Sequence, residues 1–161
     1  MRIAVLTVSD KGARGDRDDR SGPLLAELAC ELCGGEIVDR RIVADDRADI
    51  AAVIRDMARE ADLVLTTGGT GIGPRDVTPE ATRDAIEKEL PGFGEIMRLR
   101  SYDSTPRAIL SRGISGTLGT TLIVNFPGSI RAIRECLPLV APVFAHAVEL
   151  LQTESVECGG D

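Results

Sequence analysis

The segment 66–82, TTGGTGIGPRDVTPEAT, places glycines and an aspartate directly before an expected helix. Glycines let the backbone approach a ligand closely, and successive free amides can form an anion-binding nest. Gly69, Gly71 and Gly73 are spaced G-x-G-x-G, Pro74 replaces the third glycine of a dinucleotide fingerprint, and no Gly-Lys-Ser/Thr follows as in a Walker A loop. The segment therefore predicts an anion-binding turn of neither type, and a tight turn without a ligand is the alternative.

Asp76 is the unexpected residue of this segment, because a carboxylate should repel a phosphate. A polyphosphate beside it is tolerated best with Mg²⁺ in between, since Mg²⁺ is held by one or two carboxylates plus phosphate oxygens. That ion would also neutralise charge on a leaving pyrophosphate. The alternative for Asp76 is an Asx-turn ahead of the helix. Asp45, after the run EIVDRRIV, is a second candidate carboxylate, although its position alone favours a helix cap.

Two further apolar runs end in small or polar residues. Ser9, Asp10 and Lys11 follow IAVLTV, and Pro127-Gly128-Ser129 follows TTLIVNF. Ser129 is placed to cap the next helix, and Gly128 allows a close backbone approach. Ligands of open α/β sheets bind beyond the carboxyl ends of the strands, so these ends predict one shared pocket.

The elements that must position these residues follow from the hydrophobic pattern. Strands are expected at 3–8, 36–43, 62–67 and 120–126, and helices at 22–35, 47–61, 78–90, 91–101 and 137–151. Asp45 or Asp46 would cap the second helix, and Thr78 the third, with Pro79 at its first position. Residues 105–119 predict a short helix followed by a hairpin. The alternation of strands with helices along the chain predicts an α/β three-layer sandwich with a mostly parallel central sheet and helices on both faces. One domain is expected over 1–152, with a polar, flexible tail over 153–161.

The composition excludes several classes of function. A formal charge of −7 argues against a nucleic-acid or membrane-surface binder, and 2% aromatic residues leave no platform for stacking bases. No apolar stretch reaches the expected length of a membrane helix, and the N-terminus shows no cleavage pattern, so a cytoplasmic protein is predicted.

Several reactive residue types carry no prediction of chemistry. Cys30 and Cys33 form a C-x-x-C at the C-terminal end of an expected helix, where the dipole does not lower a thiol pKa. Cys136 and Cys158 are isolated, and His146 lies in the apolar last helix. The loop GARGDRDDRSG is expected to be solvated, although Arg14, Arg17 or Arg20 could fold over an anion.

The motifs together resemble a known family. TTGGTGIGPRDVTPEAT is similar to the signature loop of the MogA/MoaB-type molybdenum cofactor biosynthesis proteins, which include the G domain of gephyrin. LTVSDKGARGDRDDRSGPLL, RRIVADD, PGFGEIMR, AILSRGISGTLGTTLIVNFPGS and PLVAPVFAHAVELL follow in the family's order. The resemblance covers nearly the whole chain.

This resemblance implies a cytoplasmic homotrimer that adenylylates molybdopterin with Mg-ATP, releases pyrophosphate and passes its product to a molybdate-insertion protein. It assigns catalysis to Asp45 and Asp76, with Asp76 also at the metal. The remaining residues that it places at the ligands are Ser9, Asp10, Gly68, Gly69, Thr70, Gly71, Ser111, Pro127, Gly128 and Ser129.

Three alternatives accompany this interpretation. A MoaB-like branch would bind molybdopterin with weak or no adenylyltransferase activity, and the intact Asp45/Asp76 pair argues against it. A CinA-type domain would hydrolyse nucleotides, but its usual loop differs from GGTGIGPRDVT. A scaffold, as gephyrin partly is, would need further domains.

Overall fold

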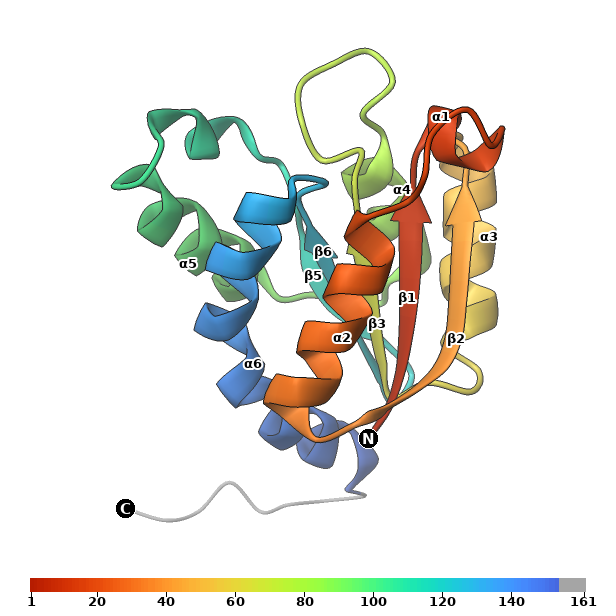
Figure 1. Cartoon of the computed structure of the whole chain (residues 1–161). Helices are drawn as coiled ribbons and strands as arrows, with labels where there is room; N and C mark the ends of the chain where they lie inside the picture. Colours follow the sequence, from red (N-terminus) through yellow and green to blue (C-terminus); the bar gives the residue numbers. More distant parts are fainter. Residues whose placement is uncertain (154–161) are drawn as a thin grey trace.

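The computed structural model describes residues 1–153 and contains one six-stranded sheet (Figure 1). Four parallel strands form its centre and one edge: β2 (Glu36–Val43), β1 (Arg2–Val8), β3 (Leu63–Thr67) and β6 (Thr121–Phe126). β5 (Ser115–Leu118) and β4 (Lys88–Glu89) continue the sheet in antiparallel pairing. The sheet is therefore mostly parallel, as predicted.

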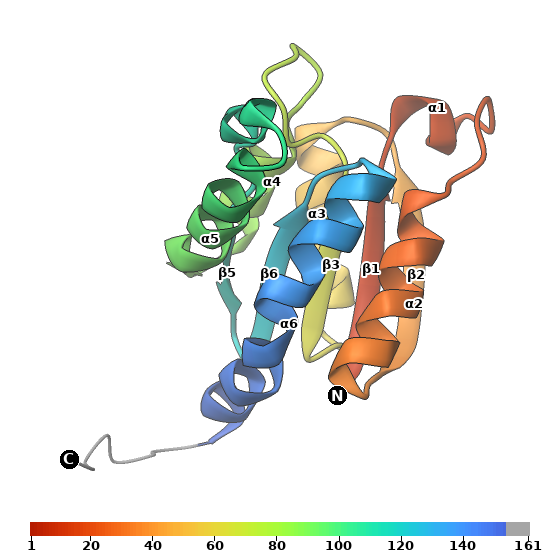
Figure 2. The same ribbon diagram turned by 60° about the vertical axis from the view of Figure 1, so that its left-hand side comes forward.

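Helices cover both faces of this sheet (Figures 1 and 2). α2 (Ser21–Cys33), α5 (Pro91–Tyr102) and α6 (Ile130–Gln152) lie on one face, and α3 (Arg47–Met57) and α4 (Thr78–Ala85) on the other. The short helix α1 (Asp10–Ala13) follows β1 at the carboxyl edge. The predicted three-layer α/β sandwich is confirmed.

Strand side chains alternate between the two resulting cores. Ile3, Val5 and Phe126 face α2, α5 and α6, whereas Ala4 and Leu6 face α3 and α4. Successive strand residues point to opposite faces, so strands buried on both sides must be apolar throughout. This requirement explains the continuous apolar runs of the sequence.

α6 is longer than the sequence prediction and begins at Ile130, with Pro138 and Pro142 inside it. Contrary to expectation, this helix is long and apolar enough to cross a membrane by length and composition alone. One face is buried against the sheet core through Ile133, Leu137 and Phe144, among others. A core helix of a globular protein meets the same criteria, and α6 packs as one.

Several predicted boundaries are wrong. The helix expected to 90 ends at Ala85, because Glu87 and Leu90 donate backbone hydrogen bonds to β5 and the chain between them becomes strand β4. Thr78 does not cap α4, since its hydroxyl donates to the Gly68 carbonyl (2.9 Å) and the helix begins at Thr78 itself. α3 ends at Met57 in a tight turn rather than at 61.

The region 105–119 forms the 3₁₀ helix η1 (Pro106–Leu110) and the β5–β6 hairpin, which confirms the prediction for this segment. Residues 154–161 of the tail expected over 153–161 lie outside the described part of the chain.

A buried polar network joins β6 to the elements beside it. Asn125 donates to the hydroxyls of Thr66 and Thr82 (2.9 Å each) and accepts from the Ile114 amide (3.2 Å). Asn125 is 1% exposed, so these partners cannot turn to bulk water. The network joins β3, β6 and α4 close to residues 68–77, the segment between β3 and α4 that we call the glycine loop.

We predict that Asn125→Ala lowers the free energy of unfolding by about 2 kcal/mol or more, because it leaves buried donors and acceptors without partners. Urea unfolding followed by circular dichroism measures this change. Leu32→Ala, at a site 43% exposed, is the control and should cost about 0.5 kcal/mol or less. Equal losses in the two variants would contradict the network's importance.

Candidate functional site

The loops that follow the neighbouring strands β1, β3 and β6 lie at the carboxyl edge of the sheet (Figure 1). The loop after β3 begins with Gly68 (φ 101°) and Gly69 (φ 62°), both in the left-handed region. A side chain at Gly68 would collide with the Val8 carbonyl oxygen, and one at Gly69 with the Thr78 hydroxyl. Only glycine fits both positions, so the chain can turn sharply against β1 and α4.

The loop after β6 packs directly on this turn. A Cβ at Gly128 would lie 3.2 Å from the Gly68 Cα, and the Thr67 hydroxyl donates to the Pro127 carbonyl (3.0 Å). Ser129 caps α6 by accepting from the Ala132 amide (3.4 Å), as predicted. The predicted residues Gly68, Pro127, Gly128 and Ser129 are therefore brought together.

The glycine loop has free amides that can bind an anion. Gly68, Gly73, Asp76 and Thr78 donate their amides within the protein, whereas those of Gly69 through Ile72 donate to no acceptor in residues 1–153. A run of free amides is the feature that the nest prediction requires. The N-terminus of α4 does not contribute as expected, because Thr78 donates to the Gly69 carbonyl (3.1 Å) and Pro79 has no amide hydrogen.

Asp76 turns back over the glycine loop. Its carboxylate accepts from the Gly73 amide (2.7 Å), and a Cβ on Gly71 or Gly73 would lie 2.8 Å from its Oδ2. The alternative of an Asx-turn toward α4 is not observed. The carboxylate instead lies against the loop whose next amides are free.

Asp45 is not a helix cap. Asp46 caps α3 by accepting from the amides of Ala48 and Asp49. The Asp45 carboxylate accepts from the Asp10 amide (2.8 Å), and the Asp45 amide donates to the Asp10 carboxylate (3.0 Å). This reciprocal pair joins the ends of β1 and β2.

Charges around Asp45 are closely coupled. Burial raises the pKa of Asp45, and the negative charges of Asp10 and Asp76 raise it further. The hydrogen bond that the Asp10 amide donates lowers it, but the pKa remains above its ordinary value. Arg75 forms a bidentate ion pair with Asp10 (2.9 and 3.0 Å), and this contact holds the pKa of Asp10 below its ordinary value. Arg75 also fastens the glycine loop to α1.

A cavity of about 560 Å³ lies between the loop, α5, η1 and the start of α6. This size is typical of small-molecule sites. Of the predicted residues, its walls include Thr70, Gly71, Ser111, Pro127 and Ser129. Met97, Ala108 and Cys136 contribute apolar surface, and Arg98 and Arg107 contribute positive charge.

A second cavity of about 240 Å³ lies on the other side of the Gly68–Gly128 contact. Its walls include the predicted residues Ser9, Gly68 and Gly128, together with Arg17 and Arg20 from the loop before α2. Ser9 also caps α1 through the Gly12 amide (3.1 Å). Asp10, Asp45, Gly69 and Asp76 line neither cavity and instead surround the loop between them.

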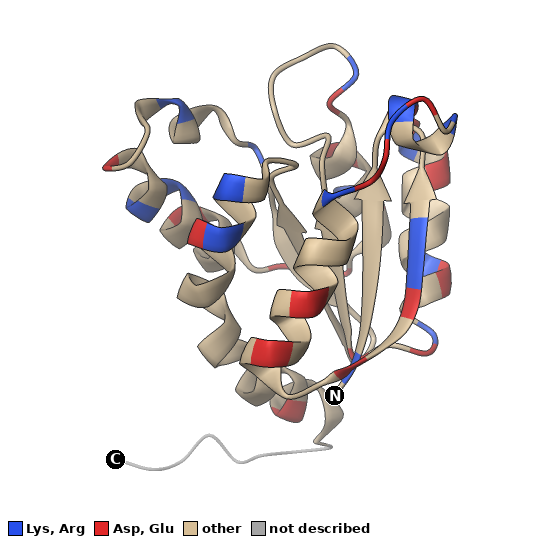
Figure 3. Cartoon of the chain, viewed as in Figure 1, with Lys and Arg blue, Asp and Glu red and all other residues tan. Residues whose placement is uncertain are grey.

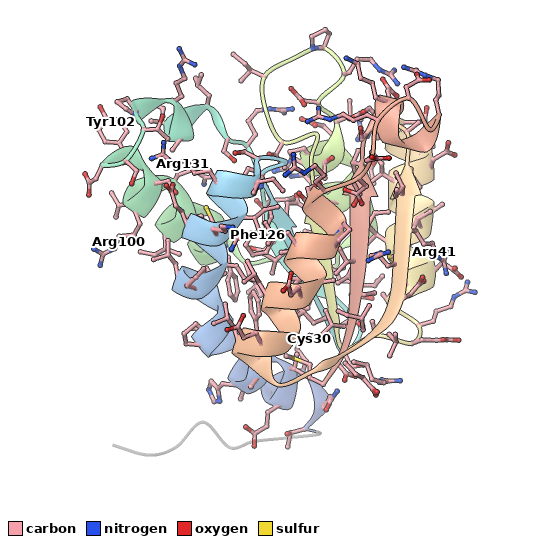
Figure 4. The ribbon with its side chains drawn as sticks, viewed as in Figure 1. Cys30, Arg41, Arg100, Tyr102, Phe126 and Arg131 are labelled. Carbon is pink, nitrogen blue, oxygen red and sulfur yellow. The ribbon has the colours of Figure 1, made fainter. Side chains whose placement is uncertain are left out.

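The carboxyl edge carries both signs of charge (Figure 3). Arg131 stands at the start of α6, on the same edge (Figure 4). Cys30 lies toward the opposite end of the sheet on α2 (Figure 4), and burial raises the pKa of Cys33, which disfavours its thiolate. His146 is exposed on α6. These positions agree with the interpretation that neither the C-x-x-C pair nor His146 belongs to the site. Cys158 lies outside the described residues.

Sequence reasoning missed Arg112. Its guanidinium donates to the carbonyls of Gly71 (2.7 Å) and Asp76 (2.6 Å) and forms an ion pair with Glu80. No spacing rule connects position 112 with 71, 76 and 80, so only the fold reveals this contact.

The described residues contain no group of three His, Cys, Asp or Glu side chains that could hold a metal ion. Asp45 and Asp76 instead fit the mode in which one or two carboxylates share Mg²⁺ with phosphate oxygens.

Comparison with known proteins places this site in context. Residues 4–146 match the family described as "Probable molybdopterin binding domain". The molybdopterin adenylyltransferase of Helicobacter pylori (strain J99) is 43% identical over 154 residues, covering 94% of this chain and 88% of that protein.

Two solved structures mark the range of similarity. The molybdopterin biosynthesis enzyme MoaB from Thermus thermophilus superposes with a TM-score of 0.86 at 45% identity, covering 93% of this chain and 95% of that one. The protein CinA from Thermoplasma acidophilum reaches a TM-score of 0.71 at 18% identity, covering 89% of this chain and 99% of that one, which shows a shared fold alone.

We predict that Arg75→Ala raises the pKa of Asp10 toward its ordinary value, because the hydrogen bond from Arg75 is the largest cause of its lowering. Carbon-detected NMR titration of the Asp10 carboxyl measures the change. Arg41→Ala on edge strand β2, which breaks ion pairs with Asp39 of the same strand and Asp56 of α3, should leave this titration unchanged (Figure 4).

Arg75→Ala should also change the free energy of unfolding, but only at pH values above the pKa of Asp10. A lowered carboxyl pKa stabilises the folded state above the unfolded-state pKa, and this contribution disappears as the pH falls through the folded-state pKa. The stability difference between wild type and Arg75→Ala should therefore be present at neutral pH and vanish in acid. A difference that grows on acidification would contradict this assignment.

Proposed function

This chain belongs to the family of probable molybdopterin binding domains, and on that premise we propose that it adenylylates molybdopterin in molybdenum cofactor biosynthesis. An oxygen of molybdopterin forms a bond to the α-phosphorus of ATP, and the bond from that phosphorus to pyrophosphate breaks. The product is the activated form that precedes molybdate insertion.

The observation that carries this proposal is the run of free amides from Gly69 to Ile72, flanked by Asp76 and opening on the 560 Å³ cavity. Free amides orient an anionic ligand without adding a cationic side chain. Phosphoryl-group chemistry needs mainly positioning and charge neutralisation, so no protein nucleophile is required.

We assign the remaining predicted residues by their positions. Thr70, Gly71, Ser111, Pro127 and Ser129 bind ligand in the larger cavity, and Ser9, Gly68 and Gly128 bind in the smaller one. Gly69 contributes to the nest. Asp10 orients Asp45, and Asp45 and Asp76 are the catalytic carboxylates, with Asp76 placed to hold the Mg²⁺ of Mg-ATP. That ion supplies charge neutralisation at the polyphosphate.

The MoaB-like alternative without adenylyltransferase activity is not favoured. Relatives at 37–43% identity over most of this chain are named molybdopterin adenylyltransferase, and both aspartates are present here. The CinA-type alternative is supported by fold alone.

We further propose that the protein works in the cytoplasm as a homotrimer and passes its product to a molybdate-insertion protein. An apolar surface supports assembly. Phe93 and Ile96 of α5 and Leu139 and Val143 of α6 line a shallow groove. Leu99, Tyr102 and Ile109 are exposed around an adjoining hollow that shares Ile96, and Figure 4 shows Tyr102 at the end of α5. Apolar surface of this kind is typical of protein interfaces.

We predict that Asp76→Asn lowers the turnover number by about 10²-fold or more, because it removes one charge from the reacting site. Asparagine can still accept from the Gly73 amide, so the fold and molybdopterin binding should be retained. The measurement is pyrophosphate release with molybdopterin, ATP and Mg²⁺, together with a binding titration of each substrate with and without Mg²⁺.

Asp49→Asn, in the exposed first turn of α3, is the matched control and should keep wild-type turnover. Near-normal pyrophosphate release by Asp76→Asn would refute the role of this carboxylate. Failure of the wild type to bind either substrate would refute the proposed function itself.

We predict a mass of three chains of 17.1 kDa each by light scattering. Val143→Arg should shift the protein toward the monomer, since it buries a charge in the proposed interface. Leu32→Arg, at a similarly exposed apolar site on α2, should leave the mass unchanged. A monomeric wild type at the concentration of the assay would contradict the trimer.

A further inference from the structure

Arg112 holds both ends of the exposed part of the glycine loop. Its backbone amide donates to the Thr70 carbonyl (2.8 Å), its Nε to the Gly71 carbonyl (2.7 Å) and its Nη2 to the Asp76 carbonyl (2.6 Å). Its Nη1 pairs with Glu80 on α4. A single side chain thus closes the segment between Gly71 and Asp76 into a loop.

These contacts also determine where the free amides point. In a trans peptide the N–H points away from the C=O of the same unit. Because the carbonyls of Thr70 and Gly71 face Arg112, the amides of Gly71 and Ile72 face away from it. Both residues line the larger cavity, and neither amide has an acceptor in residues 1–153.

Arg112 itself lines neither cavity, although its sequence neighbours Ser111 and Gly113 both line the larger one. Its guanidinium is instead engaged by the carbonyls of Gly71 and Asp76 and by Glu80. An effect of Arg112 on the reaction must pass through the loop.

Glu80 fixes Arg112 in turn. Burial is the largest single influence on the pKa of Glu80 and raises it. The hydrogen bond from Arg112, a backbone hydrogen bond and the charges of Arg112 and Arg83 together outweigh burial, so the pKa lies below its ordinary value. The second carboxylate oxygen of Glu80 is covered and has no partner in the described structure. The guanidinium is consequently anchored on α4, while its remaining donors reach the loop.

We propose that Arg112 is a positioning residue that aims the free amides of Gly71 and Ile72 into the larger cavity and fixes the backbone of Asp76. This inference rests on the proposed function, because it assigns to Arg112 the placement of the groups that act in adenylyl transfer. The planar guanidinium is required, since the single ammonium of lysine cannot reach two carbonyls and a carboxylate in fixed directions.

The first test measures the loop without any substrate. Hydrogen exchange of the Gly73, Asp76 and Thr78 amides, which are bonded inside or beside the loop, should be at least tenfold faster in Arg112→Lys than in wild type. Amides of β1, β3 and β6 should exchange at wild-type rates. Glu80→Gln, which keeps Arg112, should produce a smaller effect at the same three amides.

Arg83→Lys is the matched control, because Arg83 lies on α4 like Glu80 and its ion pair within residues 1–153 is with exposed Glu89. It should leave both the loop and the strands unchanged. Wild-type exchange at the three amides in Arg112→Lys would overturn the proposal. An equal acceleration throughout the strands would also overturn it, since the residue would then stabilise the whole fold.

The second test is a double-mutant cycle on pyrophosphate release. Misplacement of reacting groups by about 1 Å can cost on the order of 10²-fold, so Arg112→Lys should lower the turnover number by tenfold to about 10²-fold. If Arg112 acts by placing Asp76, the double variant with Asp76→Asn should be no slower than Asp76→Asn alone within about threefold. Multiplicative losses would overturn that route.

The two tests separate this inference from the proposed function. A wild type that releases no pyrophosphate would remove the proposed reaction, whereas the exchange experiment would still decide whether Arg112 orders the loop. Altered exchange with an unchanged turnover number would overturn the positioning role and leave the proposed reaction intact.

Discussion

The close contact between Gly68 and Gly128 is the constraint on which the rest of the site depends. The pairing of β3 with β6 places Thr67 opposite Phe126, so the residues after these strands must leave the sheet side by side. A Cβ at Gly128 would lie 3.2 Å from the Gly68 Cα, and one at Gly68 would strike the Val8 carbonyl oxygen. A side chain at Gly68 would therefore displace the backbone, and one at Gly128 would require the loops to shift slightly apart.

A sharp turn of this kind leaves backbone groups without regular partners, and side chains from other elements supply them. Thr78 and Arg112 donate to loop carbonyls, and Asn125 secures the strand ends below. The contacts from Thr78 and Arg112 satisfy carbonyl oxygens of the loop, whereas those of Asn125 join hydroxyls and an amide below it. These loop carbonyls are thus occupied while the amides of Gly69 through Ile72 remain available, which is the polarity that an anion site needs.

The sequence pattern predicted the fold well because each central strand is buried on both faces and must be apolar throughout. The pattern also predicted that Asp10, Asp45, Gly68 and Ser129 lie at one edge of the sheet, because the carboxyl ends of parallel strands meet at the same edge. It could not distinguish the two adjacent aspartates at the start of α3. Only the structure shows that Asp46 caps the helix while Asp45 faces Asp10. The errors at α4 have a similar origin, because tertiary contact with Gly68 takes the Thr78 hydroxyl away from the cap and pairing with β5 converts the residues after Ala85 to an edge strand. Arg112 was beyond prediction, because its partners lie 32 to 41 residues away in the chain.

The electrostatics of the edge explain why an acidic protein of charge −7 can serve an anion. Asp10, Asp45 and Asp76 lie around a run of free amides, and their mutual repulsion with burial raises the pKa of Asp45. Arg75 offsets this charge at Asp10 but lies outside both cavities. An anion alone would meet the amides favourably and the carboxylates unfavourably. Under the proposed function, an anion that carries its own divalent cation would satisfy both groups, so we expect a metal-bound polyphosphate to bind better than a bare one.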